Sequence, residues 1–472
     1  MVEKGDGADG NSSLNWKEIV LLAASAVISF QLAYFFSALS SLILVYLFCL
    51  FQLTRLRSGR HAFYTGLSIG FLACAPQLTC FWSIFHAAAI PLWIMLAFWT
   101  AMFVTLGRLC RVHFGKRYAA LLIPFIWTGL EYFRSELYYL RFSWLNAGYV
   151  FSDNLPWVPL KYLGVYGMGF FLMGLISLTS LFNSKGRILA GTLILAALGV
   201  LTNLPPLKSS YINIPPGNLQ VAGVQLEFPS ESVVISCLDK LIKKYPEAQL
   251  LALSEYTFDG PVPEKVKAWC REHQRHLIIG AKDPVSNSQF FDTAFVIGPT
   301  GEIIFRQAKS VPIQFFKDGL PATEQKLWES PWGKIGICIC YDLSYSRVTD
   351  QLIRLGAQAI IVPTMDIVDW GRHQHELHAR VAPIRAAEYG VPIFRLASSG
   401  ISQCVHQTGE VLESAPFPGD EAMISGSLDL KNPGKLPLDR IIAPLSVCVT
   451  GIVIIWLVFA TFSKNQKQPF RT

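Results

Sequence analysis

The chain has 472 residues, of which 52% are hydrophobic and 15% are charged, and it carries a net charge of +7. Soluble domains average about 25% charged residues, so this composition excludes a wholly soluble protein and places much of the chain in lipid. The 10 cysteines are too sparse for a disulfide scaffold, and no two are spaced as a C-x-x-C pair.

Residues 1–205 are mostly apolar and aromatic, and windows of about 20 residues predict seven membrane-spanning helices there. The predicted spans are 18–36, 37–53, 62–85, 88–107, 118–133, 156–183 and 187–204, and an eighth is 441–463. The segment before the first span carries Glu3, Asp6 and Asp9. Acidic residues are untypical of the start of a cleaved signal peptide, so we expect the first span to be retained.

Basic residues follow every second predicted span. Lysines and arginines, with no acidic residue among them, follow spans two, four, six and eight: Arg55, Arg57, Arg60, Arg108, Arg111, Lys116, Arg117, Lys185, Arg187, Lys464, Lys467 and Arg471. The positive-inside rule makes these loops cytoplasmic. Both chain ends are then cytoplasmic, and the segment between spans seven and eight lies on the outer side of the membrane.

That segment, residues 206–440, has the charge and the alternating pattern of an α/β domain. In chain order, the pattern predicts strands at 218–226, 249–258 and 276–282, with helices at 232–245 and 263–274 between them. A hairpin follows at 290–309, then a strand in "GKIGICICYDLSYSR" (333–347), a helix to Gly356, a strand at 358–364, a helix near 373–389, and strands at 392–400 and 409–414. This length can bury one substantial core. We expect domains at 1–205 and 206–440, followed by the last span and a tail at 441–472.

Three polar residues end predicted strands of this domain. Glu255 follows the run "LLALS", Lys309 ends the hairpin, and Cys340 ends "IGICI". Taken singly, a glutamate or lysine at a strand end is usually solvated, and a cysteine in an apolar run usually packs in the core. In α/β enzymes, however, polar residues at the carboxyl ends of strands converge on a cleft.

Together the three residues suit acyl transfer. A thiol is mostly protonated near neutral pH and needs a base, which the Glu255 carboxylate can be. Lys309 can hold the pair in place and stabilise the oxyanion of a tetrahedral intermediate. We expect the helix after Cys340 to direct its positive end at the thiolate. Cys338 lies two residues back inside the apolar run, so we expect it to pack and Cys340 to react.

The order Glu, Lys, Cys resembles the nitrilase, or carbon–nitrogen hydrolase, superfamily. "LSEYTF" (253–258), "QAKSVPI" (307–313) and "ICYD" (339–342) resemble its glutamate, lysine and cysteine motifs, and 380–400 resembles its Arg-x-x-Glu-x-Gly segment. Seven spans, this domain and one further span resemble the apolipoprotein N-acyltransferase family. "EYFRSELYYLRFSWLNAGY" (131–149) and "GVYGMGFFLMGL" (164–175) resemble two motifs of its membrane half. The resemblance implies a polytopic α-helical membrane domain plus an αββα sandwich, with Glu255, Lys309 and Cys340 as the catalytic triad.

The chain departs from the family pattern at three places. Phe315 stands where the family has a glutamate, with Asp318 the nearest carboxylate. Asp342 replaces the usual glutamate after Cys-Tyr, and Ser398-Ser399 replaces Asn-Asn. We expect Trp144, Tyr149, Tyr341 and Asp342 to bind substrate, although Trp144 and Tyr149 could equally be aromatic residues of the membrane interface.

The stretch "GRHQHELHAR" (371–380) does not predict a metal site. His375 and His378 are one residue too close for the H-E-x-x-H spacing of zinc ligands. A papain-like centre would need a histidine that activates the cysteine, but Glu255 and Lys309 explain more of the pattern of polar residues at strand ends. We therefore expect no metal, no cofactor and no nucleic-acid partner.

Three functions follow as hypotheses. By resemblance, the first is a multi-pass enzyme of the bacterial inner membrane with its catalytic domain on the periplasmic side. It would move an acyl chain from a phospholipid, through a Cys340 thioester, to the N-terminal amine of a lipid-modified apolipoprotein. The second is a membrane-anchored amidase with water as acceptor. The third is a transporter or receptor, which the scarcity of ionisable residues in the spans argues against.

Overall fold

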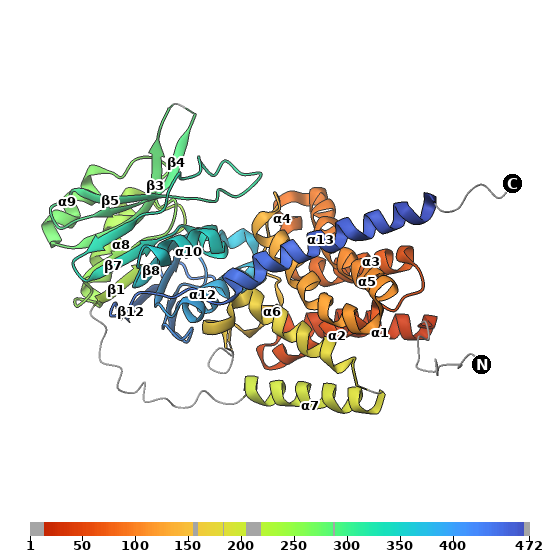
Figure 1. The fold of residues 1–472 in the computed structure, drawn as a ribbon. Coiled ribbons are helices and arrows are strands. Elements are labelled where there is room, and N and C mark those ends of the chain that lie inside the picture. The colour runs from red at the N-terminus through yellow and green to blue at the C-terminus, as the bar shows by residue number, and fades with distance from the viewer. Residues whose placement is uncertain (1–13, 154–158, 183, 204–218, 287, 467–472) are drawn as a thin grey trace, which may run out of the picture.

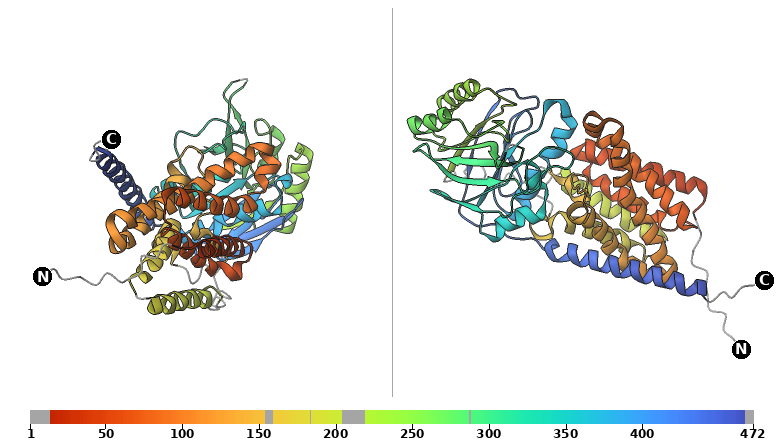
Figure 2. Two further views of the ribbon diagram at one scale, coloured as in Figure 1. Left: turned by 90° about the vertical axis from the view of Figure 1, so that its right-hand side faces the viewer. Right: turned by 90° about the horizontal axis from the view of Figure 1, so that it is seen from above.

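The computed structural model describes residues 14–153, 159–182, 184–203, 219–286 and 288–466. A helical half and an α/β half are distinguishable in Figure 1. In Figure 2 the last helix, α13 (Asp439–Gln466), starts beside the α/β half and runs along the helical half away from it. The predicted boundary between residues 205 and 206 and the acidic segment before residue 14 lie outside the described residues.

The helical half consists of apolar helices that cover the predicted spans. Their bounds are α1 Trp16–Phe35, α2 Ile43–Leu53, α3 Gly59–Gln77, α4 Cys80–Phe85, α5 Ala89–Tyr132, α6 Leu160–Thr179 and α7 Ser184–Asn203. Within the part of the chain that the structure describes, four stretches are long and apolar enough to cross a membrane: Trp16–Phe35, Cys80–Leu137, Leu160–Thr179 and Asp439–Ala460. The number of membrane crossings stays a prediction, because the other helices of this half, which include α3 with 19 residues, fall short of these stretches in length or in hydropathy.

Two of the basic loops meet at one end of this half. Helix α5 is interrupted at Gly115, whose φ of +76° reverses the chain where the predicted spans four and five join. Just before that break, Arg108 donates hydrogen bonds to the carbonyl oxygens of Leu56 and Arg57, and Arg111 donates to the hydroxyl of Thr54. The basic segments after α2 and in the middle of α5 therefore lie side by side, as a shared membrane face requires.

The α/β half contains two six-stranded sheets. One has the order β12-β1-β2-β3-β4-β5, with bounds β1 Leu219–Val224, β2 Leu250–Ala252, β3 His276–Pro284, β4 Phe290–Ile297, β5 Ile303–Ala308 and β12 Met423–Leu428. The other has the order β11-β10-β9-β8-β7-β6, with bounds β6 Leu327–Ser330, β7 Gly333–Ile337, β8 Ala359–Thr364, β9 Ile393–Ala397, β10 Gln403–Val405 and β11 Val411–Ser414. In each sheet three central strands are parallel and the outer strands are antiparallel.

Alternate residues along the strands of the first sheet face the two different layers on either side of it. Val221 and Ile278 belong to the core between the sheets, whereas their neighbours Ala222 and Ile279 pack beneath α8 (Glu231–Lys244) and α9 (Glu264–His273). On the far side, α10 (Ser346–Arg354) and α12 (Val381–Tyr389) lie against the second sheet (Figure 1), and α11 (Arg372–Ala379) contacts α12. The predicted αββα sandwich is confirmed, and α12 packs between its second sheet and α6 of the helical half.

Candidate active site

Cys340 occupies a strained turn directly after a strand. Strand β7 ends at Ile337, and a 3₁₀ turn runs from Cys340 to Ser344. Cys340 has φ of +51°, which is uncommon for a residue with a side chain and recurs at nucleophiles held on sharp turns. Cys338, by contrast, still donates its backbone N–H to Ile361 of β8 and is fully buried. The two cysteines therefore differ as expected in position: one lies within the sheet and the other on the turn.

Glu255 reaches the same point from the first sheet. Strand β2 ends at Ala252, well before residue 258 where the predicted strand ends, and Tyr256 with φ of +48° turns the chain. Glu255 is 2% exposed. Its oxygen Oε1 accepts a hydrogen bond of 2.6 Å from Lys309 Nζ, and Oε2 accepts one of 2.7 Å from the backbone N–H of Met365.

Lys309 follows β5 directly and is fully buried among three carboxylates. Its Nζ lies 2.6 Å from Glu255, 2.7 Å from Asp318 and 3.5 Å from Asp292. Burial alone would lower the pKa of the lysine, but Glu255 and Asp318 outweigh it and raise that pKa well above its usual value. Lys309 is therefore a permanent cation at the centre of the site.

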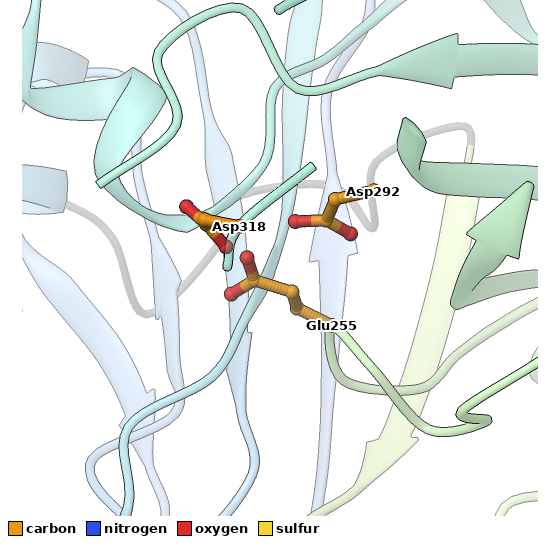
Figure 3. A group of neighbouring side chains, drawn as sticks. All are labelled: Glu255, Asp292 and Asp318. Carbon is orange, nitrogen blue, oxygen red and sulfur yellow. The ribbon is translucent and has the colours of Figure 1, made fainter. Parts of the chain in front are cut away.

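The three carboxylates also meet the spacing of a metal site. Oxygens of Glu255, Asp292 and Asp318 lie within 4.8 Å of one another, and Figure 3 shows their side chains converging from three segments of the chain. The Lys309 ammonium makes the contacts that a bound cation would make with these oxygens. Asp318, which lies three residues after the position of the missing family glutamate, is held by the Ile313 N–H and the Tyr256 hydroxyl.

The environment of Cys340 keeps its thiol neutral. Burial and the Glu255 carboxylate raise the pKa of the Cys340 thiol well above its usual value, and Lys309 opposes them only partly. The Sγ atom lies 3.7 Å from the backbone oxygen of Met365, to which it donates. A neutral thiol needs a base at the moment of attack, and Glu255 is that candidate base.

The expectation that a helix end activates Cys340 is wrong. Helix α10 begins only at Ser346, and the N–H of Ser346 donates a 3.0 Å hydrogen bond to Glu136 in the helical half. A glutamate of the helical half therefore occupies the positive end of that helix.

Met365 and Asp366 are site residues that the sequence reasoning missed. Met365 contacts both Glu255 and Cys340 through its backbone. Asp366 is buried and accepts hydrogen bonds from His378 Nδ1 at 2.8 Å and from Arg395. Both residues directly follow Thr364, the last residue of β8, so the strand-end rule applied to the predicted strand 358–364 would have found them.

Ser398 and Ser399 hold the backbone of Asp366 in place. Both hydroxyls donate to the backbone oxygen of Asp366. Burial alone would raise the pKa of Asp366, but His378 and Arg395 hold it well below its usual range. The carboxylate therefore stays charged and fixes the segment that carries Met365. The histidines share no ligand site, since His373 contacts Gln77 and His378 contacts Asp366.

An apolar cavity has walls from both halves of the protein, and Tyr341, which directly follows Cys340, lines it, whereas Cys340 itself does not. Tyr341 and Trp144, two of the expected substrate-binding residues, line it, and their rings are 5.7 Å apart. Trp144 also stacks on His378 and donates to the Ser344 hydroxyl at 2.9 Å. The remaining walls are mostly apolar: Cys80, Phe81, Ile84, Phe85, Leu92, Met95, Leu96, Leu140, Arg141, Phe142, Ile313, Gln314, Phe315, Phe316, Trp370 and Gln374.

The other two expected substrate-binding residues face inward. Asp342 accepts hydrogen bonds from the backbone N–H groups of Ser310 and Val311, next to Lys309, and from Ile339. Tyr149 is fully buried and is not among the residues that line the cavity. We infer that Asp342 positions the Lys309 loop and that Tyr149 packs where the helical half meets α12.

Comparison with known proteins gives a match to each half. Residues 22–178 match the family model of the apolipoprotein N-acyltransferase N-terminal domain, and residues 214–434 match that of carbon-nitrogen hydrolases. The chain belongs to the apolipoprotein N-acyltransferase family. This confirms the resemblance drawn from the sequence motifs, and it makes the protein a multi-pass membrane N-acyltransferase.

Relatives named apolipoprotein N-acyltransferase match across both halves. The one from Geobacter metallireducens is 23% identical over 65% of this chain and 68% of its own, and the one from Aquifex aeolicus is 25% identical over 62% and 73%. Among solved structures, a carbon-nitrogen hydrolase from Helicobacter pylori G27 has 18% identity and a TM-score of 0.40, covering 45% of this chain and 89% of its own.

Proposed function

We propose that this N-acyltransferase moves a fatty acyl chain from a phospholipid to the N-terminal amine of a diacylglyceryl-cysteine lipoprotein, with Cys340 carrying the chain as a thioester. The observation that carries the proposal is the shared cavity: its wall, which includes Tyr341 next to Cys340 in the chain, is built jointly by the α/β half and the apolar helices. An acyl chain needs such an apolar wall, and both substrates reside in the bilayer. A match to the acyltransferase N-terminal domain at 22–178 favours this function over a membrane-anchored amidase.

In the first half-reaction Glu255 takes the proton from the Cys340 thiol as Sγ attacks the ester carbonyl carbon. Lys309, held charged by its carboxylates, stabilises the oxyanion that forms. When the C–O bond breaks, the departing lysophospholipid oxygen takes the proton from Glu255, and the acyl chain remains on Sγ. The hydrogen bond from Met365 to Oε2 leaves Oε1 to exchange protons, in contact with Lys309.

In the second half-reaction the acceptor amine attacks the thioester carbonyl. An α-amine has a pKa of about 7.7–8.0, so a substantial fraction is already neutral at neutral pH. Glu255 takes the proton that the amine nitrogen loses, the C–S bond breaks, and the thiolate recovers that proton. The enzyme returns to its starting protonation state with a new amide bond formed.

We further propose that the catalytic half faces the periplasm of a bacterial inner membrane. The basis is the basic loops after alternate predicted spans, two of which lie together at one end of the helical half. Trp144 and Tyr341 then contact the acyl chain, and the α/β half has access to an exported lipoprotein.

The test is acyl transfer in phospholipid vesicles that contain the purified full-length protein, an acyl-labelled phospholipid and a diacylglyceryl-cysteine lipopeptide. We expect the label on the lipopeptide amine, and none with the Cys340→Ser variant. Label released as free fatty acid, with the lipopeptide unmodified, would instead identify a hydrolase. An N-acetylated lipopeptide is the matched control, because it offers the same lipid without the amine.

A further inference from the structure

Arg440, in the first turn of α13, donates five hydrogen bonds. Its Nε donates to both carboxylate oxygens of Asp350 at 2.8 Å, and Nη1 donates to Glu388 at 3.1 Å and to Asp439 at 2.6 Å. Its Nη2 donates to the Tyr389 hydroxyl at 2.7 Å. Four of these five hydrogen bonds reach α10 and α12 of the α/β half. Arg440 therefore attaches the start of the last helix to the catalytic half.

Glu388 links Arg440 to Arg385 and to helix α6. One of its oxygens accepts from Arg440 and from the backbone N–H of Val165 in α6 at 3.0 Å, and the other accepts from Arg385. Burial alone would raise the pKa of Glu388, but Arg440 and Arg385 outweigh it and hold it at about 2. The carboxylate is thus charged and bridges two guanidinium groups and helix α6.

Arg385 connects Glu388 to the turn that carries Cys340. It is fully buried, and it donates to the backbone oxygens of Leu343 at 3.1 Å and Ser344 at 2.8 Å. These are the last two residues of the turn that begins at Cys340. A turn whose first residue has φ of +51° persists only where its surroundings hold it.

We propose that Arg440 is a positioning residue for acyl transfer: through Glu388 and Arg385 it holds the Cys340–Ser344 turn, so that α13 supports the nucleophile. The proposal rests on Cys340 as the reacting thiol. In Figure 1, α12, which carries Glu388 and Arg385, lies beside the start of α13, as this relay requires.

Arg440→Lys tests the proposal, because lysine keeps the charge but cannot make the fork of bonds to Asp350, Glu388 and Tyr389. Misplacing reacting groups by about 1 Å can cost on the order of 10²-fold in rate. We expect iodoacetamide to alkylate Cys340 at least about tenfold more slowly in the full-length variant, as read by peptide mass. We also expect kcat to fall with the phospholipid KM unchanged, because Arg440 is not among the cavity-lining residues. The alkylation readout remains valid whatever the acyl acceptor proves to be.

Arg354→Lys is the matched control. Arg354 also approaches Asp350, at 3.9 Å, but its side chain is 62% exposed. We expect this variant to alkylate at the wild-type rate. A purely structural Arg440 would give Arg440→Lys a lower Tm with wild-type alkylation of the folded molecules, which would overturn the proposal.

A double variant distinguishes a relay from two separate effects. If Arg440 acts through Arg385, then Arg385→Lys combined with Arg440→Lys should be no slower than Arg385→Lys alone, whereas multiplied losses would refute the relay. Should Arg440→Lys fail to fold, Tyr389→Phe removes the hydroxyl that accepts from Nη2 and that also bonds Asp350 and Thr349. We then expect a smaller fall in the alkylation rate, of roughly twofold or more, and an unchanged rate would count against the relay.

Discussion

The backbone N–H of Met365 donates a 2.7 Å hydrogen bond to Glu255 Oε2, so the candidate base is held by the same residue whose carbonyl oxygen accepts from the Cys340 thiol. Base and nucleophile are thereby fixed relative to one backbone segment. Asp366, clamped by His378 and Arg395, holds that segment in turn.

Cys340→Ser should abolish acyl transfer, whereas Cys338→Ser should retain most of it. A neutral hydroxyl is a far poorer nucleophile than the thiol in this site, while Cys338 only packs within the sheet. Lipopeptide acylation by the two variants measures this, with Tm as the control for folding. Activity in Cys340→Ser but not in Cys338→Ser would reverse the assignment of the nucleophile.

Lys309→Met should lower the acylation rate by about 10²–10³-fold, as loss of a group that stabilises an oxyanion does. The single-turnover rate of thioester formation on Cys340 is the measurement. Because Lys309 also neutralises Glu255 and Asp318, we expect a lower Tm as well. Normal turnover would remove Lys309 from the mechanism.

The pKa of the Cys340 thiol should move in opposite directions in two variants. Glu255→Gln removes a carboxylate that raises this pKa and leaves Lys309, so the pKa should fall. Lys309→Met removes the cation that lowers it, so the pKa should rise further. Thiolate ultraviolet absorbance against pH, with Cys340→Ser as the blank, gives both values. Shifts of the same sign would show that the two side chains do not flank the thiol as described.

The catalytic half should be exported. A phosphatase reporter fused after residue 430 should be active, because it would lie outside the cytoplasm, and one fused after residue 464 should be inactive. The physical reason is the run of basic residues after alternate spans. The reverse pattern would invert the topology and make lipoprotein acylation untenable for this chain.

The parts of the site that could be predicted from sequence lie at strand ends. Glu255, Lys309 and Cys340 each close a local apolar run, so periodicity indicates that they lie near strand ends. Arg440 acts through contacts with Glu388 and Asp350, which lie 52 and 90 positions away and which no local pattern encodes. The strain at Cys340 is likewise a property of the folded turn.

Two local predictions failed for identifiable reasons. The expected helix near 373–389 is broken after Ala379, because Pro383 has no N–H and its ring would clash with the carbonyl group four residues earlier. The expected strand at 249–258 stops at Ala252, because the chain must leave the sheet to bring Glu255 to Lys309. The second failure lies at the candidate site itself, where sequence-based expectations of local structure most often fail.

The measurement that tests the central claim most directly is intact-mass analysis of full-length protein incubated with phospholipid, comparing wild type with Glu255→Gln. Glutamine keeps the shape of Glu255 but cannot accept the thiol proton. We predict an acyl adduct on wild-type Cys340 that a lipopeptide amine discharges and water discharges only slowly, and adduct formation slower by about 10²–10⁴-fold in the variant. Lipopeptide acylation by wild type without any adduct on Cys340, or an adduct that forms at the wild-type rate in Glu255→Gln, would contradict the account.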